Sequence, residues 1–304
     1  MNRRHLTSLA SLSFALTLAA PLAVQAQAPP DFSKVEIKTT KLTDNFYVLE
    51  GQGGAIGVLP GPDGVFMVDT QFAPLSEKIA AAIKQVSDRP IKFVVNTHVH
   101  GDHTGGNENF GKMGVTILAR PQLRDRLEHP NPGANGQPGV PTPPAGLPVI
   151  TYDAPLTLQL NGEEIHLIPA PKAHTDGDTF VQFVKANVIM TGDFYRSIQY
   201  PNIDRNNGGS LPGLVAALDA VIKAAGPATK IVPGHGPVVD RAAVTAHRDM
   251  VIAIRDKVAK LVKEGKTQEQ VVAAKPTADY DAKVQQPGTT ADRFVGQLYA
   301  ELRK

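Results

Sequence analysis

The sequence predicts an α/β protein whose main domain is made of two similar halves. Three observations predict this class. Short apolar runs of strand length recur from Asn45 onward, separated by glycine and proline. Segments with a helical spacing of apolar residues lie between and after these runs. In both halves a predicted strand leads into a loop that contains histidine, and we find no internal repeat and no linker between the halves.

The first half is predicted to contain five strands and two helices. Turn residues at 60–64 separate the second strand from the third. In the first helix Leu75, Ile79 and Ile83 lie close to one face, which predicts an amphipathic element. The expected strands are 46–51, 53–59, 64–69, 91–96 and 115–119, and the expected helices are 75–87 and 121–127.

The second half is also predicted to contain both strands and helices. It follows a stretch dense in proline and glycine, His129 to Pro148. We expect that stretch to be a long surface loop without regular structure, and loops of this length are often functional. The expected strands are 156–160, 163–169, 179–184, 187–193 and 230–236, and the expected helices are 211–225, 241–264, 267–274 and 290–303.

Residues 1–26 predict an export signal. Arg3 and Arg4 precede a mildly apolar run, and small residues precede a predicted cleavage site after Ala26. The run is too short to span a membrane, so we expect no stable membrane anchor after cleavage. The paired arginines resemble a twin-arginine signal, and an ordinary secretory signal is equally compatible. We therefore expect a periplasmic or secreted protein in which residues 27–304 form a single domain.

The composition of the mature chain argues against several classes of function. Removing Arg3 and Arg4 lowers the 31 lysines and arginines to 29, which equals the 29 aspartates and glutamates. A chain without a basic excess is not expected to bind nucleic acid. The sequence contains no cysteine, which excludes disulfides, thiolate metal sites and thiol nucleophiles. We expect a small-molecule substrate, and no pattern in the sequence indicates the oligomeric state.

The segment NTHVHGDHTGG, which begins at Asn96, is the strongest functional signal. It places three histidines and one aspartate within six residues. Residues two apart in an extended chain point the same way, so His98 and His100 can bind one ion. Gly101 should disfavour a helix and turn the chain, which directs Asp102 and His103 toward a second position. A solvated polar loop is the alternative, but this density of imidazole and carboxylate groups is typical of a zinc site.

Three further loops carry one candidate ligand each. The segment AHTDGD contains His174, MTGDF contains Asp193 and PGHG contains His235. Each candidate follows a predicted strand and has glycine nearby, where the backbone can approach an ion closely. The sequence therefore offers seven candidate ligands in four loops.

With these motifs the chain resembles the metallo-β-lactamase-fold hydrolase superfamily from about Asn45 to about Ala246. The shared pattern is H-x-H-x-D-H followed by a single histidine, an aspartate and a final histidine. The resemblance implies a four-layer αββα sandwich with two metal ions in a cleft at one edge of the sheets. It implies that His98, His100 and His174 bind one metal, that Asp102, His103 and His235 bind the other, that Asp193 bridges them, and that Asp69 supports the metal loop through hydrogen bonds.

The resemblance also implies the chemistry. Two zinc ions, with iron or manganese as alternatives, share a hydroxide that attacks an electron-poor carbonyl. Asp102 is expected to orient this hydroxide and to carry its proton. One subclass of β-lactamases has a cysteine where this chain has Asp193, and the aspartate resembles glyoxalase II and lactonases instead. The leading expectation is a β-lactamase-like amide hydrolase. A lactonase, thioesterase or other ester hydrolase comes second, and a sulfatase or phosphodiesterase third.

Candidate substrate contacts follow from the same resemblance. Arg196 lies where the cysteine-type enzymes carry a lysine that binds the carboxylate of the drug, and an ordinary surface ion pair is the alternative. Asn206 and Asn207 resemble the region where those enzymes place an asparagine near the carbonyl. Tyr195 is a further candidate donor to a substrate oxygen, and packing in the interior is the alternative. A non-catalytic metal-binding protein would be expected to lack ligands, and none is missing.

Overall fold

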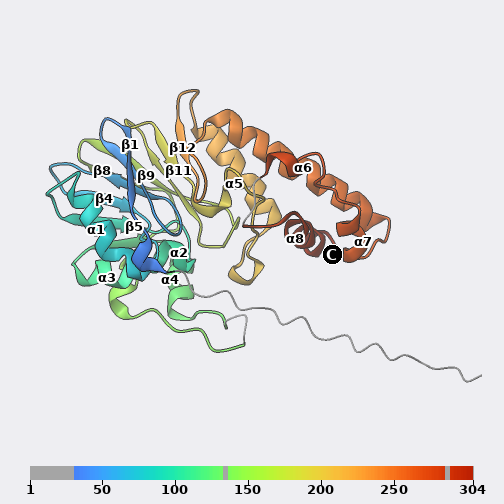
Figure 1. Ribbon diagram of the computed structural model, residues 1–304, viewed down its shortest axis with the longest axis horizontal. Coiled ribbons are helices and arrows are strands. Elements are labelled where there is room, and N and C mark those ends of the chain that lie inside the picture. The colour runs from blue at the N-terminus through green and yellow to red at the C-terminus, as the bar shows by residue number, and fades with distance from the viewer. Residues whose placement is uncertain (1–30, 133–135, 285–287, 304) are drawn as a thin grey trace, which may run out of the picture. The chain divides into compact units, whose positions relative to one another are not determined.

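Two β-sheets packed face to face form the centre of the molecule (Figure 1). This computed structural model describes residues 31–132, 136–284 and 288–303. The predicted export signal at 1–26 lies outside the described residues. The chain from Phe32 onward forms one compact unit. Within the described ranges, no helix has both the length and the apolar character needed to cross a membrane.

The first sheet has seven strands in sequence order. Its first four strands are antiparallel to their neighbours, whereas the fourth to the seventh are parallel. The strands are β1 (Lys38–Thr43), β2 (Phe46–Glu50), β3 (Ile56–Leu59), β4 (Val65–Val68), β5 (Ile91–Val95), β6 (Thr116–Ala119) and β7 (Ile150–Thr151). The parallel pairing of β4 with β5 places their carboxyl ends at the same edge of this sheet.

The second sheet has five strands in the order β12-β11-β10-β9-β8. Neighbouring strands are antiparallel except β11 and β12, which are parallel. The strands are β8 (Leu156–Leu160), β9 (Glu163–Pro169), β10 (Thr179–Phe183), β11 (Val188–Met190) and β12 (Lys230–Val232). The loops after β11 and β12 carry Asp193 and His235, so these two candidate ligands leave the sheet at one edge.

Helices cover the outer face of each sheet, which confirms the predicted four-layer αββα sandwich (Figure 1). One buried apolar cluster joins the first sheet to α1 and α3, and a second lies between the sheets. A third joins the second sheet to α5, α6 and α8. The helices are α1 (Ser76–Lys84), α2 (Gly101–Thr104), α3 (Asn107–Lys112), α4 (Pro121–Glu128), α5 (Leu211–Ala224), α6 (Arg241–Lys263), α7 (Gln268–Ala273) and α8 (Ala291–Leu302).

Aromatic packing fixes the spacing of the two sheets. The ring of Phe183 in β10 lies 4.6 Å from that of Phe46 in β2 and 6.0 Å from that of Phe66 in β4, measured between ring centroids. All three side chains are fully buried. Tilted and edge-on pairs at these distances stabilise a core beyond the area that they bury. The sheet edges that carry the candidate ligands are therefore held at a fixed separation.

Several elements differ from the sequence-based expectation. The expectation that Gly101 disfavours a helix is wrong, because the one-turn helix α2 begins at this residue. The amides of His103 and Thr104 both donate to the carbonyl of His100, at 2.9 and 3.0 Å. The entropic cost of glycine applies mainly to the interior of a helix, and Gly101 occupies the first position of a single turn. The strands β1 and β7 and the short helix α3 were not predicted.

Candidate metal centre

Asp69 holds the loop that follows β5. It directly follows β4 and has a left-handed backbone conformation, with φ of 63°. Its carboxylate accepts hydrogen bonds from the amide and the hydroxyl of Thr97, both at 2.7 Å. The same carboxylate lies 2.7 Å from Nδ1 of His103. This contact directs the Nε2 atom of His103 away from Asp69 and toward the other candidate ligands.

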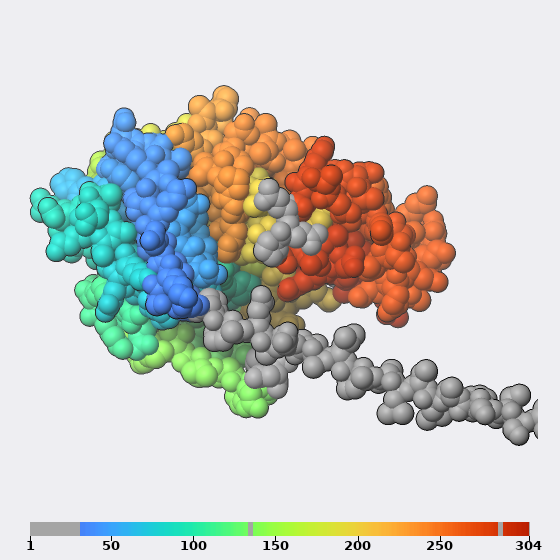
Figure 2. All heavy atoms as spheres, viewed as in Figure 1, coloured from blue at the N-terminus to red at the C-terminus, as the bar shows by residue number. Residues whose placement is uncertain are grey.

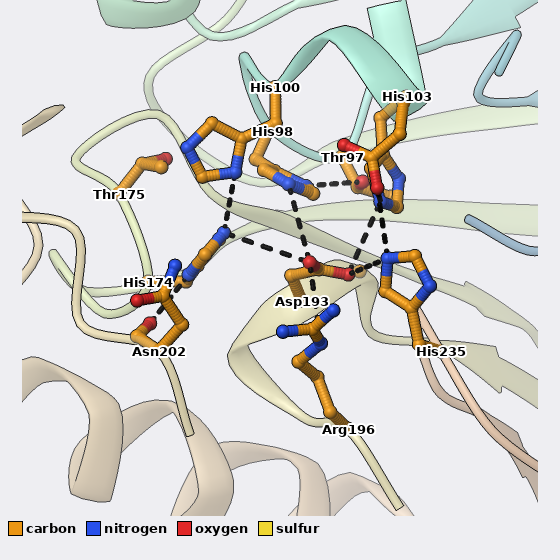
Figure 3. Close-up of polar contacts among 12 residues, drawn as sticks. Thr97, His98, His100, His103, His174, Thr175, Asp193, Arg196, Asn202 and His235 are labelled. Atoms are coloured by element: carbon orange, nitrogen blue, oxygen red, sulfur yellow. Dashed lines mark hydrogen bonds and ion pairs between the residues drawn. The ribbon is translucent and has the colours of Figure 1, made fainter. Parts of the chain in front are cut away.

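The seven candidate ligands converge as two overlapping groups, and all of them except Asp102 are labelled in Figure 3. Within each group every residue offers a ligand atom, and these atoms lie within 4.8 Å of one another. Asp193 belongs to both groups. Ligand group 1 contains His98, His100, His174 and Asp193, and ligand group 2 contains Asp102, His103, Asp193 and His235. The sets coincide with those that the resemblance implies.

Two imidazoles of ligand group 1 are oriented by their neighbours. His174 Nδ1 lies 2.6 Å from the main-chain carbonyl of Asn202, and His100 Nε2 lies 2.7 Å from Oδ2 of Asp204. Their remaining nitrogens, Nε2 of His174 and Nδ1 of His100, face each other at 2.8 Å. Outer hydrogen bonds of this kind fix the tautomer and the ring orientation of histidines that bind metal.

Buried polar atoms without a hydrogen-bond partner test whether a metal fits here. Among the described residues, Nε2 of His98, His103 and His235 and Oδ1 of Asp193 are buried and make no hydrogen bond. Such orphaned groups are costly unless something else satisfies them. Imidazole nitrogen and carboxylate oxygen are zinc donors, and metal bound in both ligand groups would satisfy these four atoms. The residues present therefore fit a metal.

Two glycines are required where the backbone approaches the ligands. A Cβ atom at Gly54 would lie 2.0 Å from Cε1 of His103, and one at Gly234 would lie 2.0 Å from Oδ1 of Asp193. Neither position tolerates a side chain without displacing a ligand. The glycines in GGAIGVL and PGHG thus have a steric role at this site.

The electrostatics of the two groups differ. Burial lowers the pKa of His98 well below its usual value and that of His174 to about 4, so both rings are neutral at pH 7. Burial would also lower the pKa of His103, but the carboxylates of Asp193 and Asp69 raise it overall. In turn, His103 and His235 outweigh burial and hold the pKa of Asp193 well below its usual value. His98, His174 and Asp193 are thus in the forms that bind metal, whereas the raised pKa of His103 favours a protonated ring that must release its proton when a metal binds.

Arg196 lies at the edge of the ligand groups. Figure 3 shows its guanidinium pointing toward Asp193, and Nε lies 3.6 Å from Oδ2 of that residue. The side chain is 14% exposed, and its Nε is buried without a hydrogen bond among the described residues. Arg196 is therefore a cation inside the site rather than part of a surface ion pair.

The other predicted substrate contacts are Tyr195, which is buried, Asn207, whose side chain is hydrogen-bonded to other residues, and Asn206, which is exposed. The side chain of Tyr195 is 1% exposed, and its ring packs edge-on against His247 in the core. This burial removes Tyr195 from contact with a substrate in this structure. The side chain of Asn207 donates to Asp204 and accepts from Asn131, at 2.7 and 3.0 Å. Asn206 is exposed beside it.

A cavity of about 540 Å³ opens next to His100. Its wall combines α2 with the end of α4, the proline-rich stretch and the segment around Asn206. The described residues of the His129–Pro148 stretch are mostly irregular, as predicted, apart from a short 3-10 turn at Pro144–Gly146. The long loop thus borders the candidate metal centre.

The fold and the two ligand groups are typical of a hydrolase with a metal site. The family model of the metallo-beta-lactamase superfamily matches residues 47–239. The chain belongs to this superfamily.

Comparison with known proteins shows the same fold in several relatives. A metallo-beta-lactamase from Pontibacter korlensis is 19% identical, with a TM-score of 0.57 over 71% of this chain and 99% of that one. The sec-alkylsulfatase Pisa1 from Pseudomonas sp. is 16% identical, with a TM-score of 0.65 over 86% of this chain and 50% of that one. A curated linear primary-alkylsulfatase from Pseudomonas sp. (strain ATCC 19151) is 36% identical over 77 residues. That match covers 23% of this chain and 15% of the alkylsulfatase.

Proposed function

We propose that this protein is a dinuclear zinc hydrolase that cleaves an acyl bond in a small molecule, with β-lactamase-like amide hydrolysis as the leading reaction. The observation that carries the proposal is the sharing of Asp193 by two ligand groups in which four buried ligand-type atoms make no hydrogen bond among the described residues. Five imidazoles with carboxylates favour zinc, and iron and manganese are the alternatives. When bound, two such ions generate a nucleophile from water near neutral pH and polarise the scissile carbonyl.

Asp102 handles the proton in this proposal. Its side chain is 25% exposed, more than the other carboxylate of ligand group 2, and its Oδ2 lies 3.0 Å from Nε2 of His235. The contact with His235 helps to hold its pKa at about 2, although burial acts in the opposite direction, so the carboxylate is ionised. It orients the attacking water, accepts a proton at Oδ2 and transfers it to the leaving nitrogen or oxygen.

Arg196 and the cavity beside His100 support a small anionic molecule as the substrate. A guanidinium without a hydrogen bond at Nε can bind a carboxylate or a sulfate through two parallel hydrogen bonds. By contrast, Arg126 in the cavity wall is already paired with Asp176 through two contacts of 2.6 and 2.7 Å. The cavity therefore offers few free charges, and its volume of about 540 Å³ suits a drug-sized molecule. A small molecule with one anionic group near the scissile bond fits both features.

A sulfate ester is the second candidate. The relative that is 36% identical over 77 residues is described as a linear primary-alkylsulfatase. The cation that would bind a carboxylate in the first candidate would bind a sulfate group in the second. Lactones and thioesters complete the range of substrates that the same nucleophile can attack.

The test compares chromogenic substrates of each class on purified protein with added zinc and with chelator. We expect chelator-sensitive hydrolysis, fastest for a chromogenic cephalosporin. Faster hydrolysis of an aryl sulfate or an aryl ester would move the reaction to that class. Absence of chelator-sensitive turnover on every class from protein that holds two metal ions would refute the proposal. Arg196→Ala should raise KM for anionic substrates more than for neutral esters, whereas Arg248→Ala, which removes a surface ion pair, should not.

A further inference from the structure

The segment 202–205 orients two ligands of the candidate metal centre at once. Its first residue, Asn202, accepts the hydrogen bond of His174 through the main-chain carbonyl, and Asp204 lies within hydrogen-bonding distance of His100. The amide of Asp204 also donates to the carbonyl of His174, at 2.9 Å. Figure 3 shows Asn202 directly beside His174. A displacement of this segment would therefore reorient both imidazoles of ligand group 1.

The opposite side of the same segment is held by the C-terminal helix α8. The side chain of Gln297 uses both ends of its amide. Its Oε1 accepts from the amide of Ile203 at 3.1 Å, and its Nε2 donates to Oδ1 of Asn202 at 2.8 Å. One turn further along, Glu301 lies 3.0 Å from Nε of Arg205. Residues four apart share a helix face, so one face of α8 supplies all of these contacts.

The helix itself is anchored in the core. Phe294, Val295 and Leu298 are buried in the cluster that joins the second sheet to its helices. Phe294 stacks on Tyr200, with ring centroids 5.6 Å apart, just before the segment begins. In Figure 1 and in Figure 2 the helices near the C-terminus, in orange to red, lie on the side of the molecule away from the blue strands of the first sheet. The position of Gln297 is thus set by packing that is independent of the ligands.

We propose that Gln297 is a positioning residue for the metal centre. It lies outside residues 47–239, the part of the chain that matches the family model. Its amide satisfies one donor and one acceptor of the segment simultaneously, which fixes where the carbonyl of Asn202 and the carboxylate of Asp204 stand. Through them it fixes the rings of His174 and His100. The C-terminal helix is in this way part of the support of ligand group 1.

Metal affinity, rather than turnover, is the measurement that tests this role. The variant is Gln297→Ala in the full mature chain, and the control is Gln268→Ala. Gln268 lies on α7 and, like Gln297, lines a groove between the segment 202–206 and α8. No hydrogen bond from its side chain to 202–205 is found among the described residues. Zinc affinity is measured by competition with a chromophoric chelator, and cobalt-substituted protein reports ligand geometry through its visible absorption. Because outer partners of metal ligands typically affect affinity by about 10–100-fold, we expect roughly a 10-fold loss in Gln297→Ala.

A conservative variant separates positioning from general loosening of the helix. In Gln297→Glu the carboxylate still accepts from Ile203, and the amide of Asn202 can turn over to donate to it. We expect this variant to recover most of the zinc affinity and the cobalt spectrum of the wild type. Unchanged zinc affinity in Gln297→Ala would overturn the inference. An equal loss in Gln268→Ala would overturn it as well, because the effect would then not depend on the segment. Wild-type protein that binds no zinc would refute both this inference and the proposed function.

Discussion

The two ligand groups share Asp193 but differ in how firmly the protein holds them. In ligand group 1, His98 and His174 are 1% exposed. His174 and His100 are each held from behind by a bond to the segment 202–204, at 2.6 and 2.7 Å. Among the described residues, His103 is the one imidazole of ligand group 2 whose second ring nitrogen lies within hydrogen-bonding distance of a residue outside the group, Asp69.

The other members of ligand group 2 are less enclosed. The side chains of Asp102 and His235 are 25% and 18% exposed. Among the described residues, the ring nitrogen Nε2 of His235 contacts only carboxylates of its own group, at 3.0 and 3.4 Å. A site whose ligands are oriented in advance binds metal more tightly, since less freedom is lost on binding. We therefore expect ligand group 1 to retain its metal longer, and ligand group 2 to adapt to the substrate.

The largest effect is expected from removing the ligand that both groups share. Asp193→Ala should leave less than one metal ion per chain, because each group loses a carboxylate. Loss of metal that stabilises the transition state by several kcal/mol corresponds to a fall in turnover of about 10³-fold. Elemental analysis and turnover would be measured together, with the surface variant Asp279→Ala as the control. Two tightly held ions in Asp193→Ala would show that this residue is not shared.

Asp102→Asn should affect ligand group 2 alone. The side chain keeps its size but loses its charge and its capacity to accept a proton. Because general acid–base groups contribute about 10²–10⁴-fold, turnover should fall by at least about 10²-fold while close to one metal ion remains. Titration of the metal-free variant with zinc would count the sites that remain. Wild-type turnover in pure Asp102→Asn protein would remove this residue from the catalytic role.

The carboxylates behind the ligands offer a matched pair of variants. Asp204→Asn should weaken the metal of ligand group 1, and Asp69→Asn that of ligand group 2, each by about 10–100-fold. Each substitution keeps an acceptor oxygen but removes the charge that orients the imidazole. Stepwise removal of metal by a chelator would reveal which of the two ions leaves first in each variant. If both variants lose the same ion first, the assignment of the two carboxylates to different groups is wrong.

The last prediction concerns His247, a buried histidine outside both ligand groups. Its effect on stability can be measured in metal-free protein, where acid unfolding is not combined with loss of metal. Burial lowers the pKa of His247 to about 4, against 6.5 in the unfolded chain. As pH falls from 6.5 to 4, the unfolded state takes up a proton that the folded state does not, so stability decreases. This linkage amounts to about 2–3 kcal/mol at pH 4.5. In metal-free protein, His247→Leu should therefore lose less stability than the wild type between pH 7 and 4.5 in urea unfolding. Equal losses would contradict this.

The candidate ligands could be predicted from the sequence because the patterns that mark them involve neighbouring residues. Four ligand-type residues within six positions, and three more beside glycine after predicted strands, stand out without any knowledge of tertiary contacts. The resemblance then divided them into the two sets that the structure brings together. Most strands and helices were accessible for the same reason, since apolar periodicity is a property of neighbouring residues.

The residues that orient the candidate ligands could not be predicted from the sequence. Asp204 lies 104 positions from His100, and Gln297 lies 95 positions from Asn202, so only the folded chain brings them together. Asp204 has mainly polar neighbours, and Gln297 is a single polar residue among apolar ones in a predicted helix, so neither residue stands out in the sequence. The prediction that Gly101 disfavours a helix was wrong for a different reason. Its low helix propensity is outweighed by the hydrogen bonds that the amides of a single turn donate to His100. The edge strands β1 and β7 lack a clear apolar alternation and were missed.

The origin of the ligands in two different sheets has a mechanical consequence. His98 and His103 leave the first sheet, whereas Asp193 and His235 leave the second. An ion bound between them would link the two sheets reversibly in a chain that has no disulfide. The resistance of the folded chain to unfolding then rises with the concentration of free metal around it. In surroundings depleted of metal, the two sheets would separate more readily and become accessible to proteases.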